Sequence, residues 1–285
     1  MLEMNIHTFI GADKGYNESD ICIYGCPFDG TTSYRPGARF APSSIRNESY
    51  GIETYSPYQD LDLTDFNIYD GGDLEIPIGN TQKVLEITKT YALGILKDKK
   101  LPFLVGGEHL VTLAQVRACT EIFPDLHIIH FDAHCDLRNE YMGEKLSHAT
   151  VMRRCFELVG ENRIFQFGIR SGAKEEFEFA TSRVYINKFD LNTLDDVVEK
   201  LKGKNVYFSV DLDVLNPSEM PGTGTPEAGG ISFKELLDGI LKVGKLNVVA
   251  VDVCELAPPY DASGISTSLA CKLVREMLLA LKPKQ

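Results

Sequence analysis

Short apolar runs alternate with longer segments of helical periodicity, and this alternation restricts the possible fold more than any other feature of the chain. The runs are continuous rather than alternating and too short for helices, as expected for strands covered on both faces; they are residues 21–25, 101–105, 126–131, 163–169, 206–210 and 247–253. Between them, apolar residues recur at helical spacing over 81–97, 110–120, 147–159 and 232–242. The pattern predicts an α/β fold with a mostly parallel central sheet and helices on both faces.

The composition fits one large globular domain. The chain has 285 residues, of which 44% are hydrophobic, and no repeat or Pro/Gly/Ser-rich linker divides it. We therefore expect a single domain over 1–285, with a short N-terminal extension over about 1–20. A net charge of −12 argues against nucleic acid and membrane surfaces as partners and mildly favours small cations. Seven scattered cysteines without a C-x-x-C motif, and no signal-like start, indicate free thiols in the cytoplasm.

The unusual polar residues follow the predicted strands. G-G-E-H follows 101–105, D-A-H-C-D follows 126–131, D-L-D follows 206–210, and C-E-L-A-P-P-Y-D follows 247–253. Carboxyl ends of parallel strands lie at one edge of a sheet, and α/β sheets bind ligands in the crevice beyond that edge. We expect these segments to converge there, with the tandem glycines 106 and 107 allowing a sharp turn before His109.

Four aspartates gathered in one crevice would repel each other unless cations are present. Four negative charges are balanced by two divalent cations, and residues two apart in an extended segment point the same way. Imidazoles complete a mixed oxygen and nitrogen set that suits Mn²⁺ better than Ca²⁺, and the absence of thiolates argues against structural zinc. The predicted metal ligands are His109, Asp132, His134, Asp136, Asp211 and Asp213.

Each motif taken alone has a plainer interpretation. His109 could simply begin a helix, and Asp211 and Asp213 could cap a strand end. His127 and His130 lie inside a predicted strand, and we interpret them as packed core histidines. The convergence of three motifs after three separate strands is what favours a metal site.

The same segments resemble the signature blocks of the ureohydrolases, the family of arginase, agmatinase and related amidine hydrolases. The blocks are G-G-E-H, F-D-A-H-C-D, S-H-A-T, the D-L-D segment running into P-G-T-G-T-P (221–226), and D-V-C-E-L-A-P-P-Y-D. The resemblance extends from roughly residue 20 to the C-terminus, and the stretch 27–46 is most similar to agmatinases. It implies a three-layer α/β/α fold, a bridged Mn²⁺ pair and usually trimers or hexamers.

The resemblance also implies a mechanism. A metal pair lowers the pKa of bound water, and a metal-bridging hydroxide would attack the guanidinium carbon. Glu255 matches the substrate-binding glutamate and His148 the catalytic proton shuttle, whereas each alone could be a loop glutamate or a helix-start histidine. The uncharged 221–226 loop is expected to form a rigid wall of the pocket.

Agmatine is the leading candidate substrate. The loop after Asp136 does not resemble the arginase loop that binds the substrate carboxylate, and agmatine has no carboxylate. Arginine, guanidinobutyrate and formimidoylglutamate stay open because Arg138 and Lys145 could receive a carboxylate. A non-catalytic metal-binding relative is a further alternative, and the P-G-T-G-T-P block argues against a deacetylase. Departures from the family pattern occur at Glu108, Ala149, Asn216, Leu256 and Ala257.

Overall fold

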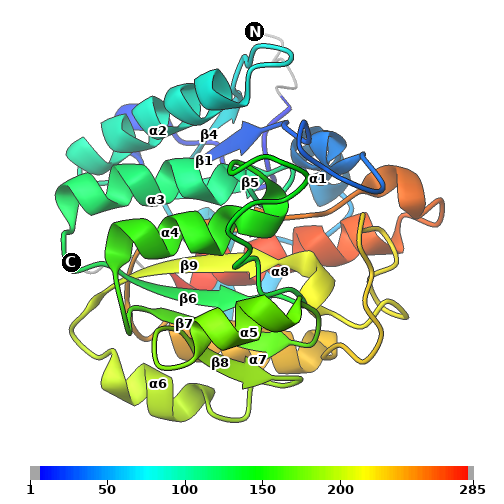
Figure 1. The fold of residues 1–285 in the computed structure, drawn as a ribbon. Helices are drawn as coiled ribbons and strands as arrows, with labels where there is room; N and C mark the ends of the chain where they lie inside the picture. Colours follow the sequence, from blue (N-terminus) through cyan, green and yellow to red (C-terminus); the bar gives the residue numbers. More distant parts are fainter. Residues whose placement is uncertain (1–6, 282–285) are drawn as a thin grey trace, which may run out of the picture.

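The architecture is built around one eight-stranded sheet (Figure 1). A computed structural model describes residues 7–281; residues 1–6 and 282–285, the two ends of the predicted domain, lie outside the described residues. The strand order is β4-β1-β5-β10-β9-β6-β7-β8, and every neighbouring pair is parallel. The strands are β1 (Ile21–Cys26), β4 (Ile68–Asp73), β5 (Leu101–Gly106), β6 (His127–Phe131), β7 (Ile164–Ile169), β8 (Tyr185–Lys188), β9 (Asn205–Asp211) and β10 (Asn247–Cys254).

All six predicted runs form strands of this sheet, and the structure adds two edge strands that the apolar pattern did not indicate. β4 contains I-Y-D-G-G-D and β8 contains Y-I-N-K, and each has a single aliphatic residue, an isoleucine. Each edge strand has a neighbour on one side only, so it does not need a continuous apolar sequence. A separate two-stranded antiparallel sheet is formed by β2 (Tyr55–Ser56) and β3 (Leu61–Asp62).

Helices cover both faces of the sheet, so the predicted three-layer α/β/α fold is confirmed (Figure 1). One face packs against α2 (Thr81–Lys97), α3 (Val111–Ile122), α4 (Val151–Val159) and α5 (Lys174–Ala180). The opposite face packs against α1 (Ala41–Ser49), α6 (Leu194–Lys200), α7 (Phe233–Val243) and α8 (Ile265–Ala280). The four helical segments predicted from periodicity correspond to α2, α3, α4 and α7.

Alternate residues of a strand enter opposite layers of the core. Ile128 of β6 packs in the layer under α3 and α4, and Ile129 packs in the layer under α7 and α8. Because the pleat places successive side chains on opposite faces, a strand covered on both sides is apolar at every position. This explains why the central strands were recognisable from continuous apolar runs.

Two further features bear on the expectations from sequence. Each of the seven cysteines is buried and carries a free thiol. Among residues 7–281, no helix combines the length and the apolar character needed to cross a membrane.

Candidate metal centre and active site

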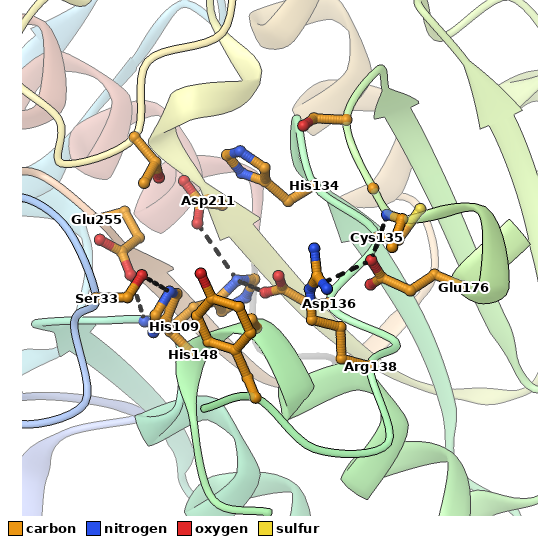
Figure 2. A pocket seen from close by; sticks show the side chains of 16 residues that line it. Ser33, His109, His134, Cys135, Asp136, Arg138, His148, Glu176, Asp211 and Glu255 are labelled. Atoms are coloured by element: carbon orange, nitrogen blue, oxygen red, sulfur yellow. Dashed lines mark hydrogen bonds and ion pairs between the residues drawn. The ribbon is translucent and has the colours of Figure 1, made fainter. Parts of the chain in front are cut away.

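Four adjacent strands in the middle of the sheet deliver the polar residues to one place. β5, β10, β9 and β6 are consecutive neighbours, and their carboxyl ends lead into the segments that carry His109, Glu255, Asp211 and Asp132. A cavity of about 280 Å³ lies beyond this edge, and Figure 2 shows the side chains that line it. The predicted convergence at the carboxyl edge is therefore present in the structure.

The glycines before His109 serve close packing. A Cβ on Gly107 would lie 2.0 Å from the carbonyl oxygen of Phe28, and one on Gly106 would lie 2.5 Å from Cys254 Sγ. Neither glycine has the positive φ that a sharp left-handed turn requires. These two positions exclude larger residues because neighbouring segments pass against the backbone here, and the chain bends at 107–108 before His109, as expected from sequence.

Three carboxylates surround the imidazole of His109. Its Nδ1 lies 3.1 Å from Asp132 Oδ2, 3.2 Å from Asp136 Oδ2 and 3.3 Å from Asp211 Oδ2. All four side chains are buried. Their oxygen and nitrogen atoms form the first half of the cluster.

The second half of the cluster is centred on His134. Its Nδ1 lies 3.0 Å from Asp213 Oδ2 and 3.5 Å from Asp132 Oδ1. Asp132 therefore turns one oxygen to each imidazole and links the two halves. The six residues predicted as metal ligands are all brought together.

The hydrogen bonds of His109 show why this cluster needs a positive charge. Ser209 Oγ donates to Asp252 Oδ1 at 2.8 Å, so it accepts from the Nε2–H of His109 at 2.9 Å. Neutral His109 then presents an Nδ1 lone pair to the surrounding carboxylates. Within the described part of the chain, Nδ1 of His109 and Oδ2 of Asp132 have no hydrogen-bond partner. The donor set fits a divalent cation, since lone pairs and carboxylate oxygens converge where only a cation or a proton removes the repulsion.

Shifted pKa values describe the same charge imbalance. Burial, reinforced by the charge of Asp132, raises the pKa of Asp136 to about 7. Burial and neighbouring Asp213 and Asp132 raise the pKa of Asp211 well above its usual range. Although burial opposes it, the surrounding carboxylates raise the pKa of His109 and of His134 well above the ordinary imidazole value.

We expect the chelator-treated protein to lose stability as the pH rises from 6.5 to 8.5. In this window the folded chain holds protons on Asp136, Glu255, His109 and His134 that the unfolded chain has released, so stability falls with rising pH. One pKa unit corresponds to about 1.4 kcal/mol, and about 1 kcal/mol moves the Tm of a domain of 150–250 residues by about 2–4 °C. Calorimetry should therefore show a Tm lower by several degrees at pH 8.5.

Added Mn²⁺ is the control for this prediction. A cation replaces the lost protons and should raise the Tm most at pH 8.5. A chelated protein whose Tm rises between pH 6.5 and 8.5 would contradict the prediction.

His148 is oriented by the segment after β1. Its Nδ1 lies 3.0 Å from the carbonyl oxygen of Thr31, which can only accept, so the ring proton is on Nδ1. Its backbone N–H donates to Thr31 Oγ1 at 3.1 Å. Nε2 is left towards the cavity, 3.3 Å from Ser33 Oγ (Figure 2). Burial lowers the pKa of His148, which favours the neutral ring.

Glu255 is held beside the metal cluster by the backbone of the β5 segment. Its Oε1 accepts the N–H of His109 at 2.8 Å, and its own N–H donates to the carbonyl oxygen of Gly107 at 2.9 Å. Glu255 and Asp136 have positive φ values of 66° and 54°, which cost about 1–2 kcal/mol per residue. Burial and the nearby charge of Glu108 raise the pKa of Glu255 to about 8.

The outer wall of the cavity contains Arg138 but not Lys145. Arg138 Nε lies 3.6 Å from Glu176 Oε2, and the guanidinium stacks over Tyr141 at 5.0 Å. Lys145 is exposed and does not line the cavity. Of the two cations considered for binding a substrate carboxylate, only Arg138 lines the cavity. Its guanidinium is already paired with the buried carboxylate of Glu176.

Several residues that shape the site carried no role in the sequence analysis. Thr31 and Ser33 lie in the 27–46 stretch and orient His148, while Glu176 lies in α5, far from any recognised motif. Glu108 accepts the N–H of Thr31 at 2.8 Å and so fixes that stretch beneath His148. In the 221–226 loop, Thr225 lines the cavity, and its Oγ1 lies 3.4 Å from Asp213 Oδ2.

A three-layer α/β/α sheet whose carboxyl edge gathers buried aspartates and histidines around a cavity defines a metal-binding hydrolase class. The sequence profile of the arginase family matches residues 19–280. The chain is 48% identical to the agmatinase of Bacillus subtilis over 276 residues, which cover 95% of each protein. The chain belongs to the arginase family, and the resemblance to the ureohydrolases is confirmed.

Two further relatives show how similar this chain is to other members. The crystal structure of a putative agmatinase from Clostridium difficile superposes with a TM-score of 0.92 at 51% identity, covering 94% of this chain and 98% of that one. The N(1)-aminopropylagmatine ureohydrolase of Thermococcus kodakarensis is 40% identical over 242 residues, 82% of each chain.

Proposed function

We propose that the protein hydrolyses agmatine and water to putrescine and urea. The observation that carries the proposal is the cluster of four aspartates and two histidines beside Glu255 and His148 in one cavity. The relatives named agmatinase, which match nearly the whole chain, support agmatine as the substrate.

The proposed cofactor is a pair of Mn²⁺ ions. His109, Asp132, His134, Asp136, Asp211 and Asp213 would together hold the two ions, with Asp132 facing both halves of the cluster. When bound, the ions supply a water whose pKa falls from 15.7 to about 7, so that a nucleophile exists at neutral pH. Two doubly charged ions balance the four aspartates, so a cationic substrate meets no net repulsion at the cluster.

Glu255 is proposed to bind and orient the guanidinium. Its Oε1 is fixed by the N–H of His109, which aligns the carboxylate beside the metal cluster. A guanidinium cation would keep Glu255 ionised, since an opposite charge within a few ångströms lowers a carboxyl pKa. The pairing orients the guanidinium carbon towards the activated water.

His148 is proposed to carry the proton to the departing amine. Thr31 holds the Nδ1–H, so Nε2 is the nitrogen that takes up and releases protons on the cavity side. Breaking the C–N bond of agmatine releases an amine, which leaves readily only after it is protonated.

The outer wall supports agmatine over substrates with a carboxylate. Arg138 is the only cavity-lining lysine or arginine among the described residues, and it forms an ion pair with Glu176. A guanidino acid would have to compete with Glu176 for this guanidinium, whereas the aminobutyl end of agmatine needs no cationic partner.

Urea release from a panel of guanidino compounds tests the proposal. We expect kcat/KM for agmatine to exceed those for arginine and guanidinobutyrate by at least about 100-fold, the size of a lost or opposed charge pair of about 3 kcal/mol. Formimidoylglutamate, which yields formamide instead of urea, should be assayed by its loss. Equal or faster turnover of any of these acids would reject agmatine as the preferred substrate.

N(1)-Aminopropylagmatine is the second candidate because of the 40% identical relative named for it. Including it in the panel separates the two amines.

We also propose that the protein is cytoplasmic, which the free buried cysteines support, and that it forms a homotrimer or homohexamer, which the family resemblance supports. A protein that binds Mn²⁺ but turns over no compound of the panel would favour the non-catalytic alternative.

A further inference from the structure

His130 lies beside the metal cluster, although the sequence indicated only a packed core histidine. The side chain is fully buried in β6, and its ring centroid is 4.9 Å from that of His109. Its Nε2 lies 2.9 Å from Asp132 Oδ2, although neither atom has a hydrogen-bond partner among the described residues. A histidine this close to the linking carboxylate is either a further metal ligand or a donor to that carboxylate.

Gln166 decides between these two roles. It is the register partner of His130 on β7, and its Nε2 donates to the carbonyl oxygen of Cys135 at 2.7 Å. Because that carbonyl can only accept, the orientation of the Gln166 amide is fixed. The same NH₂ group lies 2.9 Å from His130 Nδ1, which must therefore accept its second hydrogen.

The proton of neutral His130 is consequently on Nε2, the nitrogen that lies 2.9 Å from Asp132 Oδ2. A metal ligand needs a lone pair on the coordinating nitrogen, so an imidazole with Nε2–H towards the cluster can act as a donor to the carboxylate and not as a ligand. We propose that His130 and Gln166 are positioning residues that hold the carboxylate of Asp132 in the orientation that binds both metal ions. The inference rests on the proposed metal centre.

The location of Asp132 gives this pair its importance. Asp132 is the residue whose two oxygens face the two imidazoles, at 3.1 Å from His109 Nδ1 and 3.5 Å from His134 Nδ1. A rotation of the carboxylate would disturb both halves of the cluster. The backbone N–H of His134 donates to Oδ1 at 2.6 Å, and the proton on His130 Nε2, which lies 2.9 Å from Oδ2, would supply the matching restraint on the other oxygen.

The test is the affinity of the chelator-stripped full-length protein for Mn²⁺, measured from the electron paramagnetic resonance signal of free Mn²⁺. We expect His130→Leu to weaken binding by about 10–100-fold, the effect typical of losing an outer partner of a metal ligand. His130→Gln, whose amide nitrogen reaches the position of Nε2, should recover most of the affinity. His127→Leu removes another histidine of the same strand and should bind as the wild type does.

Wild-type affinity in His130→Leu would overturn the inference, as would loss of one metal equivalent in both His130 variants, which would make His130 a ligand. If circular dichroism shows that His130→Leu is unfolded, Gln166→Met provides the test: weaker binding of both ions supports the inference, and unchanged binding overturns it. A wild-type protein that binds fewer than two Mn²⁺ ions would instead reject the proposed metal centre.

Discussion

Asp132→Asn is expected to abolish urea release and to leave the purified protein with little bound metal. The substitution keeps the size of the side chain but removes the charge of Asp132, the only carboxylate within residues 7–281 that faces both imidazoles. Metal activation of water contributes several kcal/mol to such reactions, and each 1.36 kcal/mol is about tenfold in rate, so the loss should be at least about 1000-fold. Elemental analysis and a urea assay measure the two effects.

The matched control for this variant is Asp196→Asn. Asp196 is exposed on α6 and does not line the cavity, so its substitution should change neither the metal content nor the rate. An Asp132→Asn protein that retained two ions and turned over within tenfold of the wild type would exclude Asp132 from the centre.

His148→Ala is expected to lower kcat by about 10²–10⁴-fold while the metal content stays unchanged, a range typical of losing a general acid–base group. The ring is anchored by Thr31 and reaches the cavity beside Ser33, and no close contact joins it to the aspartates of the cluster. Metal binding should therefore not depend on it. Steady-state kinetics with agmatine and metal analysis of the same preparation test both parts.

Two further experiments make the test of His148 more specific. Free imidazole in the assay should restore part of the rate of His148→Ala, because the truncated side chain leaves space at the cavity wall. His7→Ala removes an exposed histidine and should behave as the wild type does. Loss of metal from His148→Ala would make His148 a ligand, and an unchanged rate would remove it from the proton transfer.

The central part of the fold was predictable because burial on both faces leaves a direct trace in the sequence. β5, β6, β9 and β10 are continuous apolar runs, and the polar motifs begin where these runs end. The edge strands β4 and β8 left no such trace, since an edge strand tolerates polar residues and glycine. The segments that converge at the site could be predicted for the same reason as the fold, since parallel strands place their carboxyl ends together.

By itself, the sequence determined the α/β architecture, the edge of the sheet at which the acidic residues gather and the need for positive charge among them. Tertiary structure alone decided which atoms face each other. His130 acquires its role from Gln166 on a neighbouring strand, and His148 from Thr31, 117 residues away. A proton is placed on one ring nitrogen by whichever acceptor or donor lies within about 3 Å, and residue order along the chain does not encode that distance.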